Sequence, residues 1–211
     1  MLTSERKQEL DERRKRWGRD NPIRLYSQKD LQCRYHSVAE HRQTIARLRD
    51  LAVFLAYLGA LYHAHGASLY GNDLPKFVAG TFIRFWPLKD IPLSSTKAEC
   101  APTVDHDVPL SFFRDMFMQE RLSACEWLYL LVSFYKAVTI AKFEDGFLSE
   151  RRDGVSYKQN RPTSAYQKRG IVLSTQSVQG YEQFQCLAEK YLDECANANY
   201  TCPRCLLAIR K

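Results

Sequence analysis

Residues 51–62 read LAVFLAYLGALY, the longest apolar run in the chain, and they lie within a pattern that predicts one long helix. We expect this helix to begin at Ser37, because Ser37 followed by Glu40 forms a capping box. Apolar residues then recur at helical spacing, and Gly66 is expected to end the helix. The first half is amphipathic, whereas residues 51–62 are apolar on every side. The helix is therefore expected to pass through the centre of the fold.

Helical spacing also predicts a hairpin and a last helix further along the chain. The hairpin joins a helix at residues 111–118 to one that starts at a second capping box, Ser123 with Glu126, and ends near Gly146. The last helix covers residues 181–196. The buried face expected for the second hairpin helix is Leu128, Leu131, Val132, Tyr135, Val138 and Thr139.

Five of the eight prolines fall between residues 71 and 110, and such density interrupts regular elements. We expect a short helix at residues 78–86 there and otherwise a long loop. At the other end of the chain, residues 4–17 are charged almost throughout, with acids placed four residues before cations. This pattern predicts an exposed helix whose order depends on docking Leu2, Leu10 and Trp17 elsewhere.

Together these patterns predict an all-α fold, a single irregular helical domain of about five to six helices with an exposed, charged N-terminal helix. Residues 1–20 would form the charged helical arm. Residues 21–211 would form the helical core domain, with a basic linker at residues 149–180 inside it. A chain of 211 residues is long enough for one such core and too short for two comfortable domains.

The composition favours a folded, basic protein without a transmembrane segment. Apolar residues make up 45% of the chain, which is ample for a core, and the run at residues 51–62 is well short of the roughly 20 residues that cross a bilayer. The net charge of +7 attracts polyanions such as nucleic acid. Residues 1–7 read MLTSERK and lack the apolar segment of a secretory signal, and the seven cysteines are an odd number. We therefore expect an intracellular protein, cytoplasmic or nuclear.

Two half-sites with metal-ligand spacing predict a structural zinc ion. Cys202 and Cys205 flank a proline and an arginine, and a Cys-x2-Cys turn can present two thiolates to one ion. Cys33 and His36 form a Cys-x2-His pair just before the long helix, which completes a four-ligand set. Cys195 is the alternative fourth ligand. The competing interpretation is that all of these are ordinary reduced cysteines in and near the core.

The segment at residues 149–180 is the best candidate for nucleic-acid binding. Between residues 156 and 170 it has four positive charges and no acid, and cations alternate with aromatic residues that can stack bases. A second basic run at residues 13–16 is largely neutralised by acids of the same helix. Solvated surface charge is the alternative for both segments. The predicted contacts are Arg151, Arg152, Tyr157, Lys158, Arg161, Tyr166, Lys168 and Arg169 in the linker, and Arg13, Arg14, Lys15 and Arg16 in the arm.

The sequence contains no phosphate-binding glycine loop, no His-Glu-x2-His and no Gly-x-Ser-x-Gly, which favours a non-catalytic protein. We expect a protein that binds nucleic acid, RNA rather than DNA, or serves a nucleoprotein assembly, in the manner of a viral accessory or regulatory protein. One alternative is a helical protein–protein adaptor or oligomer subunit with residues 82–86 as its contact strip. Another is an enzyme with an unfamiliar pocket around His36, Glu40 and His41.

Overall fold

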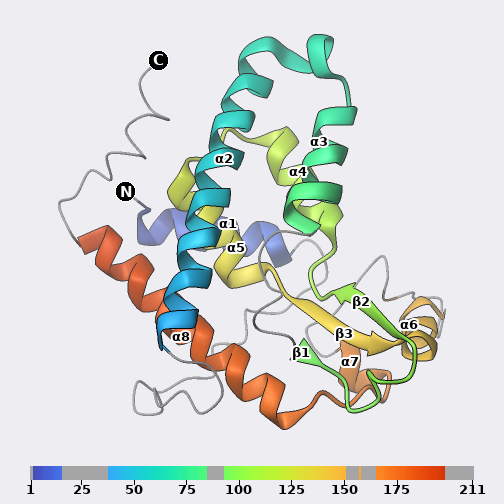
Figure 1. The fold of residues 1–211 in the computed structure, drawn as a ribbon. Helices are drawn as coiled ribbons and strands as arrows, with labels where there is room; N and C mark the ends of the chain where they lie inside the picture. The colour runs from blue at the N-terminus through green and yellow to red at the C-terminus, as the bar shows by residue number, and fades with distance from the viewer. Residues whose placement is uncertain (1, 16–37, 85–92, 151–156, 158–164, 198–211) are drawn as a thin grey trace.

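The computed structural model describes residues 2–15, 38–84, 93–150, 157 and 165–197. Over these residues the chain is mostly helical, with a small three-stranded sheet to one side of the long helices (Figure 1). The elements in chain order are α1 (Ser4–Lys15), α2 (Val38–Tyr70), α3 (Asp73–Phe77), the π-helical η2 (Val78–Ile83), β1 (Leu93–Ser94), β2 (Pro102–His106), α4 (Leu110–Gln119), α5 (Ala124–Phe134), β3 (Ala137–Ala141), α6 (Lys142–Ser149), α7 (Ala165–Lys168) and α8 (Thr175–Asn197).

Helix α2 is the long helix that the apolar run predicts. Leu51 and Leu55 are fully buried, and the helix packs against α5, α4 and α8. Gly66 breaks the helical path as expected, with φ 72° and ψ 175°, a conformation that favours glycine. The prediction of burial on every side is wrong, because Phe54 and Tyr57 are 37% and 59% exposed. One face of the apolar run therefore lies at the surface of the folded chain.

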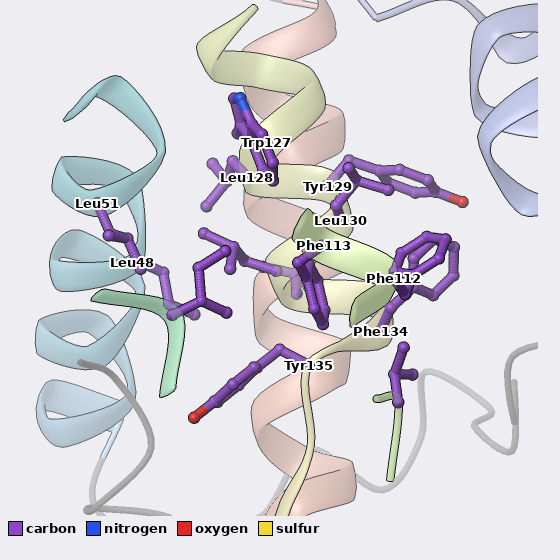
Figure 2. Close-up of a cluster of buried hydrophobic side chains, with 14 of the residues drawn as sticks. Leu48, Leu51, Phe112, Phe113, Trp127, Leu128, Tyr129, Leu130, Phe134 and Tyr135 are labelled. Atoms are coloured by element: carbon purple, nitrogen blue, oxygen red, sulfur yellow. The ribbon is translucent and has the colours of Figure 1, made fainter. Parts of the chain in front are cut away.

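Helices α4 and α5 form the predicted hairpin, and the second capping box is confirmed. The Glu126 amide donates to Ser123 Oγ at 3.3 Å, and the Ser123 amide donates to Glu126 Oε2 at 2.7 Å. Aromatic rings join the two helices, with centroids 5.8 Å apart for Phe112 and Phe134. In Figure 2, Leu48 and Leu51 of α2 point toward the side chains of α5. The buried residues of α5 are Ala124, Trp127, Leu128, Tyr129, Leu130, Leu131, Val132 and Phe134.

The sheet corrects the all-α prediction. Helix α5 ends at Phe134, and the residues expected to continue it toward Gly146 form β3 instead. Strand β3 is central: Val138 pairs with Leu93 of β1 in parallel, and Thr139 pairs with Val104 of β2 antiparallel. A run of β-branched residues at 138–140 favours a strand. Its partners lie far earlier in the proline-rich segment, so local periodicity could not pair them.

The proline-rich segment is more ordered than the long loop we expected. The helix predicted at residues 78–86 begins at Val78 and is π-helical through Ile83, and together with α3 it packs against α4. Strands β1 and β2 follow. Pro102 begins β2 at the edge of the sheet, a position where a residue without a backbone N–H is tolerated. The prolines therefore delimit elements rather than abolish them.

The N-terminal helix α1 is docked on the core and is not a free arm. Leu10 is fully buried and Leu2 packs against the core, so the predicted dependence on these two side chains is confirmed. The outer face, with Glu5, Glu9 and Glu12, is exposed as expected. The third predicted docking residue, Trp17, lies outside the described residues.

Replacing Ser123 by alanine is expected to lower the free energy of unfolding by about 1 kcal/mol, because it removes the acceptor of a first-turn N–H of α5. Ser123→Asp is the matched control, since aspartate keeps a side-chain oxygen at the N-cap. Urea unfolding of the three proteins measures the difference. Equal stability of the alanine variant and the unchanged protein would contradict this role for the capping box.

Candidate functional site

The described part of the basic linker is built into the core. Tyr166 on α7 is 7% exposed, and its hydroxyl donates to Oδ2 of Asp105 at 2.7 Å. Asp105 is itself buried at the end of β2. Because a buried carboxylate needs hydrogen-bond donors, this contact holds α7 against the sheet. The structure thus places Tyr166, a predicted nucleic-acid contact, in a buried hydrogen bond to Asp105.

Arg169 is also buried, at 8% exposed, and it ties the two ends of the linker together. Its guanidinium donates to the carbonyl oxygen of Glu150 at 3.0 Å and lies 4.3 Å from the centroid of the Tyr157 ring. Glu150 directly follows α6 and Arg169 directly follows α7. The cation–π contact engages Arg169 and Tyr157 with each other. The structure thus places Arg169, a predicted phosphate contact, in a buried position, and Tyr157 is half-buried.

Lys168 is the predicted linker contact that the structure places at the surface. It is exposed on α7, one position before the buried Arg169. The remaining linker residues, Arg151, Arg152, Lys158 and Arg161, lie outside the described residues, so their role stays a prediction.

In the arm, Arg13 faces the core and pairs with acids. It forms ion pairs with Glu9 of its own helix at 3.3 Å and with Glu120 at the end of α4. Arg6, two turns earlier on the same side of the helix, binds the same Glu120 and also Glu126, each at 2.5 Å. Arg14 and Lys15 belong to α1, but their side chains, like all of Arg16, lie outside the described part of the chain. Arg13 is therefore engaged within the protein.

These ion pairs change the acid–base properties of their members. Burial alone would raise the pKa of Glu126, but hydrogen bonds from Ser123 and Arg6 outweigh it and lower that pKa. Burial alone would lower the pKa of Arg6, whereas Glu126 and Glu9 raise it. A carboxyl pKa lowered by folding stabilises the protein above the ordinary carboxyl range, and this stabilisation is lost as the pH falls through the lowered pKa.

The predicted zinc ligands Cys33, His36, Cys202 and Cys205 all lie outside the described residues, so the zinc site stays a prediction. Within the described ranges, no group of three or more His, Cys, Asp or Glu side chains is arranged to hold a metal ion. The pocket of the enzyme alternative also stays a prediction, since His36 and the side chains of Glu40 and His41 lie outside the described part of the chain.

The described residues carry an aromatic surface that sequence reasoning found only in part. Phe54 of α2 lies 4.8 Å from Phe82 of η2 between ring centroids, and Phe77 of α3 lies 5.3 Å from the same ring, both in edge-to-face geometry. Phe77 is 53% exposed, and Tyr57 follows Phe54 by about one turn of α2. We call Phe54, Tyr57, Phe77 and Phe82 the aromatic surface. It joins α2 to the α3–η2 segment, which run side by side in Figure 1.

Of this surface, only Phe82 belongs to the contact strip predicted at residues 82–86, and residues 85–86 lie outside the described chain. Phe54 was missed because the run around it is apolar on every side. Composition therefore could not show which face of the helix is exposed to solvent. The available signal was spacing: Phe54 and Tyr57 are three apart and share a face of the helix.

Two neutral ion pairs lie close to the aromatic surface in sequence. On α2, Arg49 and Asp50 are 3.7 Å apart, about one turn before Phe54. On α3, Lys76 and Asp73 are 3.9 Å apart, directly before Phe77. All four side chains are at least 39% exposed. Each of these two pairs is neutral as a whole.

No family model, curated protein or solved structure matches this chain. Among the described helices, none combines the length and the apolar character needed to cross a membrane.

Replacing Tyr166 by phenylalanine is expected to lower the free energy of unfolding by about 1–3 kcal/mol, because it removes a hydrogen bond to the buried Asp105 carboxylate. Lys168→Ala is the matched control on the same short helix and should change stability by no more than about 0.5 kcal/mol, since Lys168 is exposed. Urea unfolding measures both. A Tyr166→Phe protein as stable as the unchanged chain would show that the hydroxyl has no such structural role.

Proposed function

We propose that this chain is a non-catalytic protein-binding subunit that associates through its aromatic surface. The observation that carries the proposal is that the exposed Phe54 and Phe77 both contact the ring of the partly buried Phe82, which joins them into one cluster. Large apolar side chains scattered singly over a surface are ordinary, whereas a contiguous group marks an interaction site. Aromatic residues are also the side chains that contribute most to protein–protein binding.

The partner that we favour is a second copy of the chain. The ion pairs that precede Phe54 and Phe77 in sequence are each neutral, so they add no net charge that would repel a second copy. Opposite charges on each copy can also pair across a two-fold axis, in which the same surface contributes from both sides. A strongly charged border would have favoured a partner of opposite charge instead.

The double substitution Phe54→Ser and Phe77→Ser is expected to weaken self-association by at least about tenfold, because truncating an aromatic residue at the centre of an interface typically costs more than 1 kcal/mol. Phe82 is left unchanged because it packs partly against the core. Sedimentation velocity over a concentration series measures the dimer fraction.

Phe143→Ser with Phe147→Ser is the matched control, since these two phenylalanines are also exposed, at 46% and 38%, but lie on α6. This control should associate like the unchanged protein. A chain that remains monomeric throughout the series, or an equal loss in both double variants, would overturn the second-copy proposal.

Nucleic-acid binding is a second candidate function, and the observation in its favour is the net charge of +7. Lys168 is exposed, and four further linker cations, Arg151, Arg152, Lys158 and Arg161, remain predicted contacts. We rank this function second because Tyr166 and Arg169 are buried, and Arg13 is held in ion pairs. Of the predicted linker contacts that the structure describes, Lys168 is exposed and Tyr157 is half-buried, and the contacts outside the described residues stay predictions.

If the second function holds, the chain binds mixed-sequence RNA at low salt, and affinity falls steeply as salt rises, because each phosphate contact releases counterions. Replacing Arg151, Arg152, Lys158, Arg161 and Lys168 together by alanine should reduce both the affinity and the salt slope. Fluorescence anisotropy with RNA and with DNA of the same sequence gives both quantities. Absence of binding to either at low salt would exclude this function, and the Phe54→Ser, Phe77→Ser protein serves as the control that should bind normally.

A further inference from the structure

Helix α1 contacts the rest of the protein in the way a bound peptide helix contacts a receptor. The residues that face the core are Arg6, Leu10 and Arg13, spaced four and three apart on one side of the helix. Leu10 is fully buried between two arginines whose charges are matched by acids of the core. The pattern is Arg-x3-Leu-x2-Arg, an apolar anchor flanked by cations.

The acceptor surface comes from the corner between α4 and α5. Glu120 ends α4 and pairs with both Arg6 and Arg13, while Glu126 in the first turn of α5 pairs with Arg6. The hydroxyl of Tyr129, one turn further, donates to Oδ1 of Asp11 at 2.7 Å. Figure 2 shows this hydroxyl pointing away from the cluster of core side chains. We call Glu120, Glu126 and Tyr129 the acidic corner.

The acidic corner is itself a product of the α4–α5 hairpin. The Glu126 carboxylate is positioned by the capping box, because its second oxygen accepts from the Ser123 amide. Tyr129 is packed within α5 and its ring lies 5.9 Å from that of Phe134 between centroids. Contacts within the hairpin therefore position Glu126 and Tyr129 independently of α1.

Helix α1 is attached to the core by one buried side chain and a set of polar contacts. Of its described side chains only Leu10 is buried, and its outer face is charged. The other contacts that hold it are polar: Arg6 pairs with Glu120 and Glu126 at side chains that are 26%, 14% and 15% exposed, and Asp11 accepts from the Tyr129 hydroxyl. A helix of 12 residues is marginal by itself in water. Opening of α1 should thus cost much less than unfolding the protein.

We propose that the acidic corner is a docking site for a basic amphipathic helix of another protein, and that α1 occupies it as a built-in competitor. The charge complementarity seen in the bound α1 defines the partner: a helix with two cations seven residues apart and a leucine between them. Because α1 is covalently attached, its effective concentration is high, and a partner binds fully only when α1 is released. The site is separate from the aromatic surface and does not depend on it.

The test uses the full-length chain and a fluorescent synthetic peptide of residues 1–15 as the probe. In the variant Arg6→Glu with Arg13→Glu, the chain's own helix is repelled by the acidic corner, which stays intact. Fluorescence anisotropy is expected to show 1:1 binding of the peptide to this variant at least about tenfold tighter than to the unchanged chain, where α1 competes. Adding Glu120→Lys to the variant should abolish binding.

Two peptide controls make the comparison specific: a scrambled peptide of the same composition, and one with both arginines changed to glutamate. Neither should bind. A folded variant that does not bind the peptide, or an unchanged chain that binds it equally well, would overturn the proposal. If charge reversal prevents folding, Arg6→Gln with Arg13→Gln replaces it, and failure of that chain to fold also overturns the proposal, since α1 would then be part of the core.

Discussion

The rest of the structure depends on the burial of helix α5 between α2, α4 and α8. Its residues Trp127, Leu131 and Phe134 are at most 1% exposed, and rings of α4 reach it from one side while α2 and α8 pack against it from others. Burying side chains of this size contributes several kilocalories per mole each in favourable hydrophobic free energy. A helix covered on so many sides fixes the positions of its neighbours. The capping box at its first turn and the turn at Tyr135 set where it starts and stops.

Both candidate surfaces follow from that arrangement. The first turn of α5 supplies Glu126 and the next turn Tyr129, which together with Glu120 form the acidic corner that holds α1. Helix α2 packs its inner face against α5, and Phe54 and Tyr57 on its other side are exposed. Where the chain continues past α5, Tyr135 is buried, its hydroxyl donates to the carbonyl oxygen of Arg84, and burial raises the pKa of that phenol. The core thereby links the helical part to the sheet.

The small sheet explains why part of the basic linker is buried. Asp105 and Asp107 are buried at the end of β2, and the interior must supply donors for such carboxylates. Tyr166 meets this requirement for Asp105, and Arg169 in turn binds Glu150 and Tyr157. The described part of this basic, aromatic segment therefore has a structural role: it holds α7 against the sheet and against the end of α6. Lys168, between these two buried residues, is what remains at the surface.

Local chemistry in the sequence determined the features that are set within a few residues: the long helix with its break at Gly66, the capping box of Ser123 and Glu126, and the dependence of the N-terminal helix on Leu10. These follow from helical periodicity and from hydrogen bonds between near neighbours in the chain. Strand β3 was missed because pairing joins Val138 to Leu93 and Thr139 to Val104, contacts that no local pattern encodes. Which aromatic and charged side chains are buried was likewise decided by the tertiary structure alone. Tyr166 and Arg169 are residue types that are common at nucleic-acid-binding surfaces. Their burial depends on contacts with Asp105 and Tyr157, which only the folded chain brings next to them.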